Sequence, residues 1–457
     1  MRKVLGLFGF AVAAAIALSV TGRAQVPATG TIAFTNARII DGTGRAPIEQ
    51  GTIVVKDGRI DVVGASVKPP KDATVVSLAG KTVMPGMVNA HGHVNINTNV
   101  TDQSKPDQLA QRLKMYASYG VTSVMSLGSD TYDEAEGFQL RDEQRMEKGP
   151  AATDAARFYS AGRPILYRPD PNAGGPKPGT ETEADARADV DRHLPFHPDF
   201  IKLHIDHIPT DLKPNVRSAL IDEAHKNGVK VAVHLYYLEE AKDVVARGAD
   251  VIAHSVRDQD VDASLIAAMK QHNVGYIPTL TRDLAVFVYE STPDFFKDPF
   301  FVRGMSLYKR EVDVVSDPAY QEKSRTDPAI QGIKKALAQA ERNLKILSDA
   351  GIPIGMGTDT GAAPNRNPGR WQGYFEHVEL ELMVKSGLTP MQAIHDATGS
   401  AAKIMGMKGV GTIEKGNWAD LLVLNANPLT DIRNTRQIDS VYVAGRKVNS
   451  QASVSSH

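Results

Sequence analysis

Cysteine is absent from this chain of 457 residues. Its absence excludes a disulfide framework, a thiolate zinc site and a lipid anchor attached to cysteine. Any metal site in this protein must therefore use nitrogen and oxygen ligands. Such ligands also avoid thiol oxidation, which suits an exported protein.

An excess of one charge sign is also missing. The formal net charge is -1, so the chain lacks the basic surface that a nucleic-acid binder needs to neutralise phosphates. No Gly-x-x-x-x-Gly-Lys-Ser/Thr motif occurs, and nucleotide hydrolysis has no support. Hydrophobic residues make up 42% and charged residues 23%, which is typical of a globular protein. We expect a small-molecule substrate and no nucleic-acid partner, and the composition leaves a homo-oligomer open.

The N-terminus has the layout of a secretory signal peptide. Arg2 and Lys3 precede an apolar run over residues 4–20, and Gly22-Arg23-Ala24 supplies small residues for cleavage. A membrane anchor is the alternative, because the run is long for a signal core and short for a span. We favour cleavage of residues 1–24. The expected protein is exported, periplasmic or secreted, and keeps no stable membrane anchor.

After residue 24, both ends of the chain have the sequence pattern of short β-strands. Apolar and polar residues alternate, with turn signals at Asp41–Gly44 and Asp57-Gly58. We expect an antiparallel sheet and assign residues 25–82 and 408–457 to one small β-sandwich domain. The candidate strands are Ile53–Val55, Ile60–Val63, Val75-Val76, Ala419–Leu424 and Ser440–Gly445.

Residues 83–407 alternate short apolar runs with amphipathic stretches, which indicates repeated βα units and a parallel sheet. One expected helix, Val216–Asn227, ends at the stop signal Asn227-Gly228. Eight units predict an α/β fold, a (β/α)8 TIM barrel. The eight strands are 83–93, Val121–Leu127, Phe158–Ala161, Phe200–Ile205, Lys230–Leu235, Asp250–His254, Val274–Leu280 and Pro353–Asp359.

Two connections between these units are long. They run over residues 163–183 and 282–327. Long loops after barrel strands shape substrate pockets in many enzymes, but they are also common as surface insertions. The sequence leaves both interpretations open.

Polar residues stand at or near the carboxyl ends of several expected strands. His91 and His93 are two apart in a strand, so both imidazoles point to one face and can reach one ion. In barrels the carboxyl ends of the strands form the catalytic face. Each residue has an ordinary structural alternative, such as a hydrogen-bonded histidine or a turn-capping aspartate. Their coincidence predicts a metal site built from His91, His93, Lys202, His234, His254 and Asp359.

Lys202 is the unusual member, because it lies in an apolar run between Ile201 and Leu203. A buried ammonium must be paired, deprotonated or chemically changed. Conversion of the amine to a carbamate gives an anionic group whose two oxygens can bridge two cations. The alternatives are an ion pair with Asp206 and an outward-facing lysine on a misregistered strand.

These motifs together resemble the amidohydrolase superfamily, in particular its imidazolonepropionase-like and Xaa-Pro dipeptidase (prolidase)-like branch. The resemblance covers nearly all of the chain after residue 24. Its motifs are Pro85–His93, Ile201–Leu203, Val233-His234, Ile252–Ser255, Gly357–Thr360, Gly387–Pro390, Ala393-Ile394 and Ala397-Thr398.

The resemblance implies two zinc ions. His91, His93 and Asp359 would hold one, His234 and His254 the other, and carboxylated Lys202 and a hydroxide would bridge both. Imidazolonepropionases look mononuclear and lack the bridging lysine, so Lys202 favours the dipeptidase-like and amidase-like members.

The resemblance also implies a mechanism. Asp359 would take the proton of the hydroxide as it attacks the carbonyl and deliver it to the leaving amine. Tyr236 matches a substrate-binding tyrosine of such dipeptidases, with packing at the rim as the alternative. His204, Asp206 and His207 are either supporting groups or loop surface.

We therefore expect an exported metal-dependent amidohydrolase that cleaves the amide bond of a dipeptide or an N-acyl amino acid. Hydrolysis of a cyclic amide, an imidazolone or a lactone at the same centre is the alternative. A non-catalytic scaffold fits less well, because degenerate scaffolds usually lose metal ligands.

Overall fold

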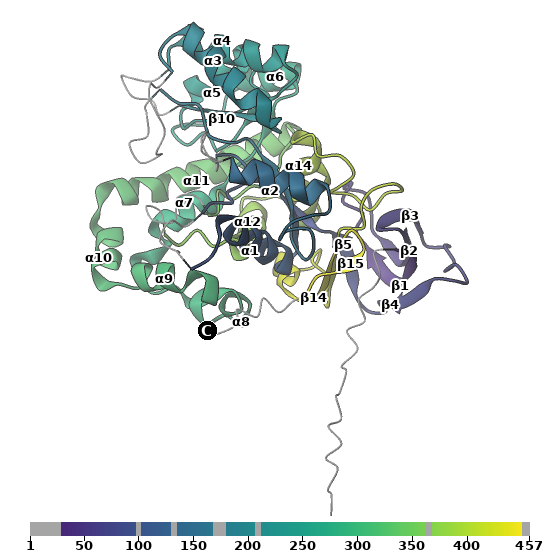
Figure 1. Ribbon diagram of the computed structural model, residues 1–457. Helices are drawn as coiled ribbons and strands as arrows, with labels where there is room; N and C mark the ends of the chain where they lie inside the picture. Colours follow the sequence, from purple (N-terminus) through teal and green to yellow (C-terminus); the bar gives the residue numbers. More distant parts are fainter. Residues whose placement is uncertain are drawn as a thin grey trace, which may run out of the picture.

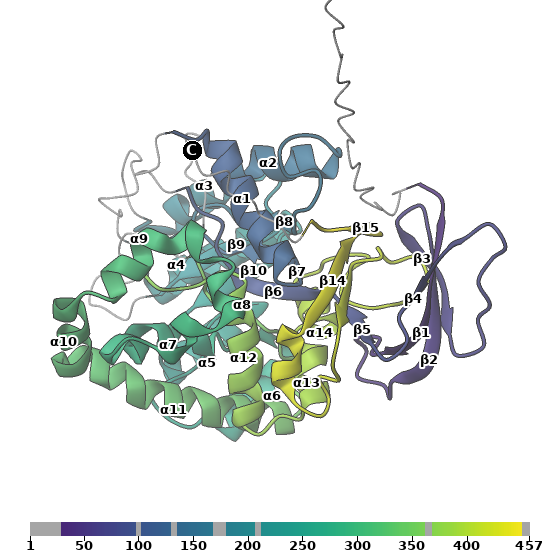
Figure 2. The same cartoon turned by 90° about the horizontal axis from the view of Figure 1, so that it is seen from below.

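The computed structural model describes residues 29–96, 102–128, 135–167, 180–205, 212–361 and 368–449. The expected signal peptide, residues 1–24, lies outside these ranges. Figures 1 and 2 show a set of inner strands covered by helices, next to a sheet built from both ends of the chain.

The inner strands, β6 to β12, form two parallel sheets. Their orders are β6-β7-β8 and β12-β11-β10-β9. Parallel strands joined by helices confirm the expected α/β class. The strands are β6 (Met87–Gly92), β7 (Val121–Ser126), β8 (Arg157–Ser160), β9 (Ile201–His204), β10 (Val231–His234), β11 (Val251–Ile252) and β12 (Gly275–Tyr276).

Residues 353–359, expected as the eighth strand, make one isolated bridge to β12 instead of a regular strand. Backbone hydrogen bonds still connect this segment to both neighbours. Gly355 N donates to Tyr276 O at 2.9 Å, and Ala90 N donates to Met356 O at 2.9 Å. Two glycines lie within the segment, and they weaken a regular strand because they have no side chain to pack.

Helices cover the inner strands. The expected helix over Val216–Asn227 is α4, which ends at Lys226 with Asn227 as its cap. The helices are α1 (Lys105–Ser118), α2 (Glu136–Arg145), α3 (Glu183–His193), α4 (Pro214–Lys226), α5 (Leu238–Ala246), α6 (Ala263–His272), α7 (Leu280–Phe287), α8 (Pro299–Val302), α9 (Met305–Val315), α10 (Pro318–Thr326), α11 (Pro328–Asp349), α12 (Tyr374–Lys385), α13 (Pro390–Asp396) and α14 (Gly399–Ile404).

The expectation of a long loop over residues 282–327 is wrong, because most of this segment is helical, from α7 to α10. The physical reason is a cluster of buried aromatic side chains, among them Tyr289, Phe301, Tyr308 and Trp371. Large aromatic rings bury much apolar surface when they pack together, and this favours ordered helices over a solvated loop. Of the other expected long loop, residues 168–179 lie outside the described ranges.

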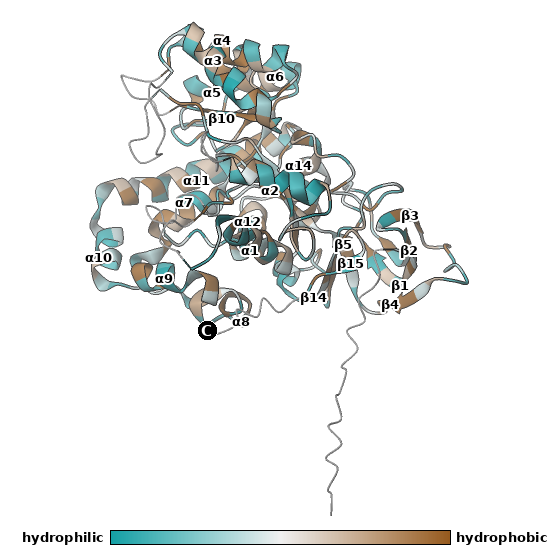
Figure 3. Cartoon of the chain, viewed as in Figure 1, coloured by the Kyte–Doolittle hydropathy of each residue, from teal (hydrophilic) through white to brown (hydrophobic). Residues whose placement is uncertain are grey.

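Helix α11 is amphipathic. Its buried residues Ala336, Ala340, Leu344 and Leu347 recur every three or four positions, and Figure 3 shows apolar and polar colours along it. None of the helices in the described ranges is long and apolar enough to cross a membrane.

The strands from the two ends of the chain form one eight-stranded sheet, called here the terminal sheet. Its order is β15-β14-β13-β5-β1-β2-β3, with β4 paired to β1. The described strands from both chain ends form this one sheet and do not show a second sheet packed against it. The expected β-sandwich and its domain boundaries therefore stay predictions. The strands are β1 (Thr31–Ile39), β2 (Ile48–Lys56), β3 (Arg59–Gly64), β4 (Thr74–Ser77), β5 (Thr82–Pro85), β13 (Leu421–Leu424), β14 (Ile438–Val443) and β15 (Arg446–Lys447).

We expected an antiparallel sheet, but the terminal sheet contains both parallel and antiparallel pairs. β1 pairs with β4 and β5 in parallel, and with β2 antiparallel. The connection over residues 65–73 explains the difference. A connection of this length lets the chain return beside β1 in the same direction, which a tight hairpin cannot do.

Gly86 joins the terminal sheet to the inner strands, since it lies between β5 and β6. Its N donates to Asp420 O at 2.9 Å. A Cβ at this position would lie only 2.1 Å from Thr122 Oγ1, so the junction requires glycine.

We expect Gly86→Ala to lower the free energy of unfolding by about 1–3 kcal/mol, because the added methyl group overpacks the junction. Urea unfolding followed by circular dichroism measures the change. Gly332→Ala, on α11 where a Cβ meets nothing within 4 Å, is the control and should match or exceed the wild-type stability. Equal midpoints for the two variants would contradict the role of Gly86.

Candidate metal centre and active site

His91 and His93 meet Asp359 at the carboxyl end of β6. The Nε2 atom of His93 lies 2.7 Å from Asp359 Oδ1, and that of His91 lies 3.4 Å from the same oxygen. All three residues are buried, and their ligand atoms lie within 4.8 Å of one another. The structure thus brings together three residues that the sequence assigned to one metal, and the group could hold a divalent ion.

The Asp359 carboxylate is positioned by its backbone. The N atoms of Thr358 and Asp359 both donate to His91 O, at 3.0 and 2.6 Å. Asp359 has a φ of 56°, a strained conformation for a residue with a side chain. Its other oxygen, Oδ2, accepts a hydrogen bond of 2.5 Å from Arg370 Nη1. Burial opposes ionisation, but Arg370 and His93 hold the pKa of Asp359 well below its usual range.

His234 ends β10, and His254 follows the end of β11 by two residues; the His254 ring lies beside those of His91 and His234. Their ring centroids are 4.2 Å apart, and the His254 centroid is 4.6 Å from that of His91. Burial lowers the pKa of all three imidazoles well below 6.5. They are neutral at neutral pH, which is the form that binds metals. His254 Nδ1 lies 2.8 Å from Thr279 Oγ1, which orients the ring and leaves Nε2 for another partner.

Lys202 extends from β9 into this group. The side chain is buried, and Lys202 pairs with Ala232 in the register of β9 and β10, so it points to the same face as His234 and not outward. Burial lowers the pKa of Lys202 to about 7, and its charge in turn lowers the pKa of His91, His234 and His254. Its alternative partner, Asp206, lies outside the described residues.

The donors present fit a divalent metal. Within the described part of the chain, His91 Nδ1 and Lys202 Nζ are buried without a hydrogen-bond partner. Buried polar atoms without partners call for an explanation, and a bound ion is one. Imidazole nitrogens with carboxylate oxygens are donors that zinc accepts.

Two further expected residues lie at the edge of the group. Tyr236 is half-buried, and the Arg257 guanidinium carbon lies 4.7 Å from its ring centroid. The ring of His204 lies 3.8 Å from that of His234, centroid to centroid. His207 lies outside the described residues.

The sequence analysis missed the arginines around Asp359. Arg370 donates to Asp359, and Arg282 Nε lies 3.7 Å from Asp359 Oδ2. Arg257 and Arg282 both bind Asp283, at 2.7 and 2.6 Å. Arg282 could have been found from its place just after an expected strand, whereas Arg370 carried no local signal.

Two buried glutamates of α12 hold the segments that carry Asp359 and Arg282. Glu376 Oε1 accepts hydrogen bonds from Asn89 Nδ2, Thr358 Oγ1 and Thr360 Oγ1, at 2.7 to 2.9 Å. It therefore fixes both neighbours of Asp359. Glu379 accepts from the backbone N of Leu280 and Thr281 and from Thr281 Oγ1, at 2.6 to 2.8 Å. It thereby holds the start of α7, which carries Arg282.

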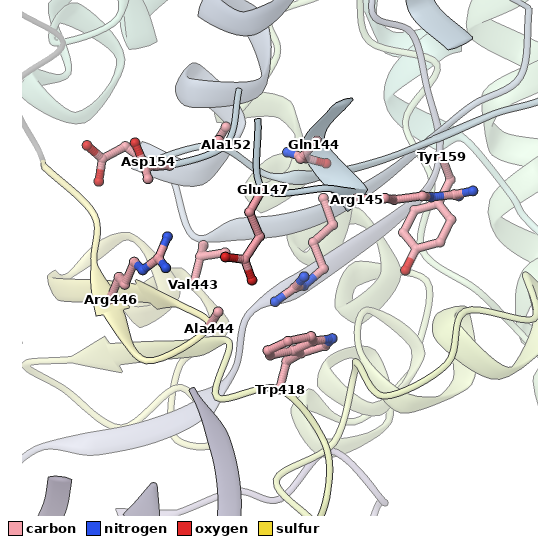
Figure 4. Close-up of a pocket in the computed structure, with 13 residues that line it drawn as sticks. Gln144, Arg145, Glu147, Ala152, Asp154, Tyr159, Trp418, Val443, Ala444 and Arg446 are labelled. Atoms are coloured by element: carbon pink, nitrogen blue, oxygen red, sulfur yellow. The ribbon is translucent and has the colours of Figure 1, made fainter. Parts of the chain in front are cut away.

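Two cavities lie at the amino ends of the inner strands, away from the candidate metal centre at their carboxyl ends. The one in Figure 4 has a volume of about 240 Å³, and Arg157 and Trp418 line it beside the amino end of β8. The other, of about 540 Å³, is lined by Lys230, Asp250 and Pro353, each at or before the start of a strand segment. Neither contains a residue of the candidate metal centre.

The sequence matches the model of the amidohydrolase family over residues 82–448. The chain belongs to this family. The match confirms the resemblance that the motifs carried, and it places the protein among hydrolases whose members act on carbon–nitrogen bonds.

Individual relatives agree with this placement. The chain is 24% identical to the imidazolonepropionase of Deinococcus radiodurans, over 88% of this chain and 92% of that enzyme. Its match with the enamidase of Eubacterium barkeri, 27% identical, spans only 56% of that enzyme and 49% of this chain.

Solved structures show the same fold. A prolidase candidate from Bifidobacterium longum superimposes with a TM-score of 0.72 and 27% identity, over 92% of this chain and 95% of that one. A Xaa-Pro dipeptidase with methionine in its active site superimposes with a TM-score of 0.69 and 20% identity, over 92% and 99%.

Glu379 predicts a pH dependence of stability. Burial raises its pKa from 4.5 to about 8, so the folded state holds a proton that the unfolded state has released. This contribution is complete below about pH 4.5 and is lost as the pH rises through about 8. We expect the urea midpoint to fall between pH 6.5 and 8.5 more steeply in the wild type than in Glu379→Gln.

The difference between the two slopes is the measurement, with both proteins free of metal. Glu322→Gln, at an exposed position on α10, should keep the wild-type slope. An unchanged slope in Glu379→Gln would show that the carboxyl is ionised throughout this range.

Proposed function

We propose that this protein is an exported, prolidase-like amidohydrolase that hydrolyses the amide bond of a dipeptide or an N-acyl amino acid at a two-metal centre. The observation that carries the proposal is the buried Lys202 amine, without a hydrogen-bond partner among the described residues, beside three neutral imidazoles. A neutral amine in that place can be converted to a bridging ligand.

Lys202 would supply the group that lets the proposed centre hold a second metal. Its neutral amine attacks carbon dioxide, forms a carbon–nitrogen bond and releases a proton, which leaves a carbamate with two oxygens. His91, His93 and Asp359 would hold one zinc, and His234 and His254 the other. Bound divalent metals supply an activated water and polarise the scissile carbonyl.

The residues of the chain do the rest of the proposed reaction. Asp359 is ionised and can take the proton of the attacking water, then give it to the leaving nitrogen. Tyr236 contacts the substrate at the rim. We also propose that β6 to β12 and residues 353–359 close into a (β/α)8 barrel, which the hydrogen bonds on both sides of that segment support.

Two relatives support different substrates. Methionine in the active site of the Xaa-Pro dipeptidase supports a substrate that yields an amino acid. The imidazolonepropionase supports the second candidate, hydrolysis of a cyclic amide, an imidazolone or a lactone at the same centre. Export depends on residues 1–24, whose pattern alone supports it.

We expect Asp359→Asn to lower kcat by about 10²–10⁴-fold, because the amide cannot accept the proton. The measurement uses a library of Xaa-Pro dipeptides and N-acyl amino acids, with the bound metal quantified in parallel. Most of the metal should stay bound. Asp222→Asn, exposed on α4, is the control. Turnover close to the wild type would remove Asp359 from proton transfer.

We expect two metals per chain by elemental analysis, and fewer in Lys202→Ala because the bridging group is gone. A carbamate signal should form with labelled carbon dioxide in the wild type and be absent from the variant. Lys226→Ala, exposed on α4, should retain both the metals and the signal. One metal with a free Lys202 amine would contradict the two-metal centre.

A further inference from the structure

Asp359 has a backbone conformation that needs support from its surroundings. Its φ of 56° lies in the left-handed region, where a residue with a side chain is strained. The backbone hydrogen bonds to His91 O set the register of this segment. The neighbouring side chains hold the turn itself. The hydroxyl groups of Thr358 and Thr360 both contact one carboxyl oxygen, Glu376 Oε1, at 2.9 and 2.7 Å.

The same carboxyl oxygen also reaches the strand that carries the histidines. Asn89 on β6 donates through Nδ2 to Glu376 Oε1 at 2.7 Å, and its Oδ1 accepts from His91 N at 3.0 Å. Both Asn89 and Glu376 are fully buried. One side chain of α12 therefore connects the segment of His91 with the segment of Asp359.

The hydrogen atoms of this cluster are too few if Glu376 is ionised. Each of its six hydrogen bonds, at 2.7 to 2.9 Å, needs a hydrogen atom of its own. The Asn89 amide supplies two and the three hydroxyl groups supply one each, which makes five. A proton on Glu376 Oε1 is the sixth. The bonded pairs are Asn89 with Thr358 and Glu376, Thr358 with Glu376 and Thr360, and Thr360 with Glu376 and Tyr116.

The second carboxyl oxygen also favours a neutral acid. Glu376 Oε2 is buried and has no hydrogen-bond partner among the described residues. An ionised carboxylate would leave charge on this oxygen without compensation, which costs more than burying the carbonyl oxygen of a neutral acid. Burial accordingly raises the pKa of Glu376, although hydrogen bonds from Thr360 and Thr358 oppose the rise.

We propose that Glu376 is a positioning residue of the metal centre, which as a neutral carboxylic acid fixes the turn that directs Asp359 toward His91 and His93. This inference rests on the metal centre of the proposed function. The proton lets Glu376 donate to one threonine and accept from the other, so that the two hydroxyl groups also bond to each other. A neutral acid places no second negative charge near Asp359, and the ionisation of Asp359 is unopposed.

The first test measures zinc binding by competition with a chelator, which needs no turnover. We expect Glu376→Ala to weaken zinc binding by about 10–100-fold, because the turn at Asp359 loses its support. Glu376→Asp should weaken binding as much, since a carboxyl group one methylene shorter cannot reach both threonines. Glu376→Gln keeps the length and the neutral charge and should stay within about threefold of the wild type.

His377→Ala is the control that separates positioning from a general loss of stability. His377 is the next residue of α12 and is equally buried, but its ring contacts Thr435 Oγ1 and Tyr119 O, at 2.9 and 2.8 Å. Its removal should lower the urea midpoint about as much as Glu376→Ala and keep zinc affinity within about threefold of the wild type. Equal losses of zinc affinity in the two variants would overturn the positioning role.

A double-mutant cycle tests the route through the threonines. Thr360→Val removes the hydroxyl group and keeps nearly the same shape. If Glu376 acts through this hydroxyl group, Thr360→Val should weaken zinc binding alone but add about threefold or less to the loss in Glu376→Ala. Losses that simply multiply would overturn this route.

Turnover separates this inference from the proposed function. With an amide substrate, Glu376→Ala should lower kcat with little change in KM, because Asp359 is misdirected. Wild-type zinc affinity in Glu376→Ala, or an equal loss in Glu376→Gln, would overturn the inference and leave amide hydrolysis intact. Zinc binding that depends on Glu376 in a protein that hydrolyses no amide would support the inference and contradict the proposed function.

Discussion

Backbone hydrogen bonds between residues 90–93 and 356–360 determine where the imidazoles and the Asp359 carboxylate meet. Ala90 N donates to Met356 O, and Thr358 N donates to His91 O, so two segments far apart in the sequence are held in register. The contact is close, because a Cβ at Gly357 would lie 2.9 Å from His91 N. The chemistry of the site thus depends on main-chain contacts, which side-chain substitutions elsewhere leave in place.

The second level of organisation is electrostatic. Asp359 Oδ1 faces the imidazoles of His91 and His93, and Oδ2 faces arginines. A buried carboxylate is tolerated because hydrogen bonds and opposite charge compensate for the lost hydration. The same compensation keeps it ionised and able to accept a proton. One side chain therefore connects the metal ligands to the cationic part of the rim.

Much of the site was predictable, because strand periodicity and strand ends are local properties. The pair His91 and His93 needs only the two-residue repeat of a strand, and Lys202 needs only apolar neighbours. The arginines were not predictable in the same way. Arg370 meets Asp359 from 11 positions further along the sequence, and no spacing rule encodes such a contact. Tertiary packing likewise decides that most of residues 282–327 are helical, because buried rings stabilise these helices.

The terminal sheet has a consequence for biosynthesis. β5 leads directly into β6, which carries His91, and β5 pairs with β13. During translation β5 therefore gains this neighbour only after residue 424 has left the ribosome, when all of the proposed metal ligands have already been made. The strand that leads into the first ligand thus waits for a partner made late in the chain. A chain interrupted before that point would carry every metal-binding side chain and still lack the frame that holds them in place.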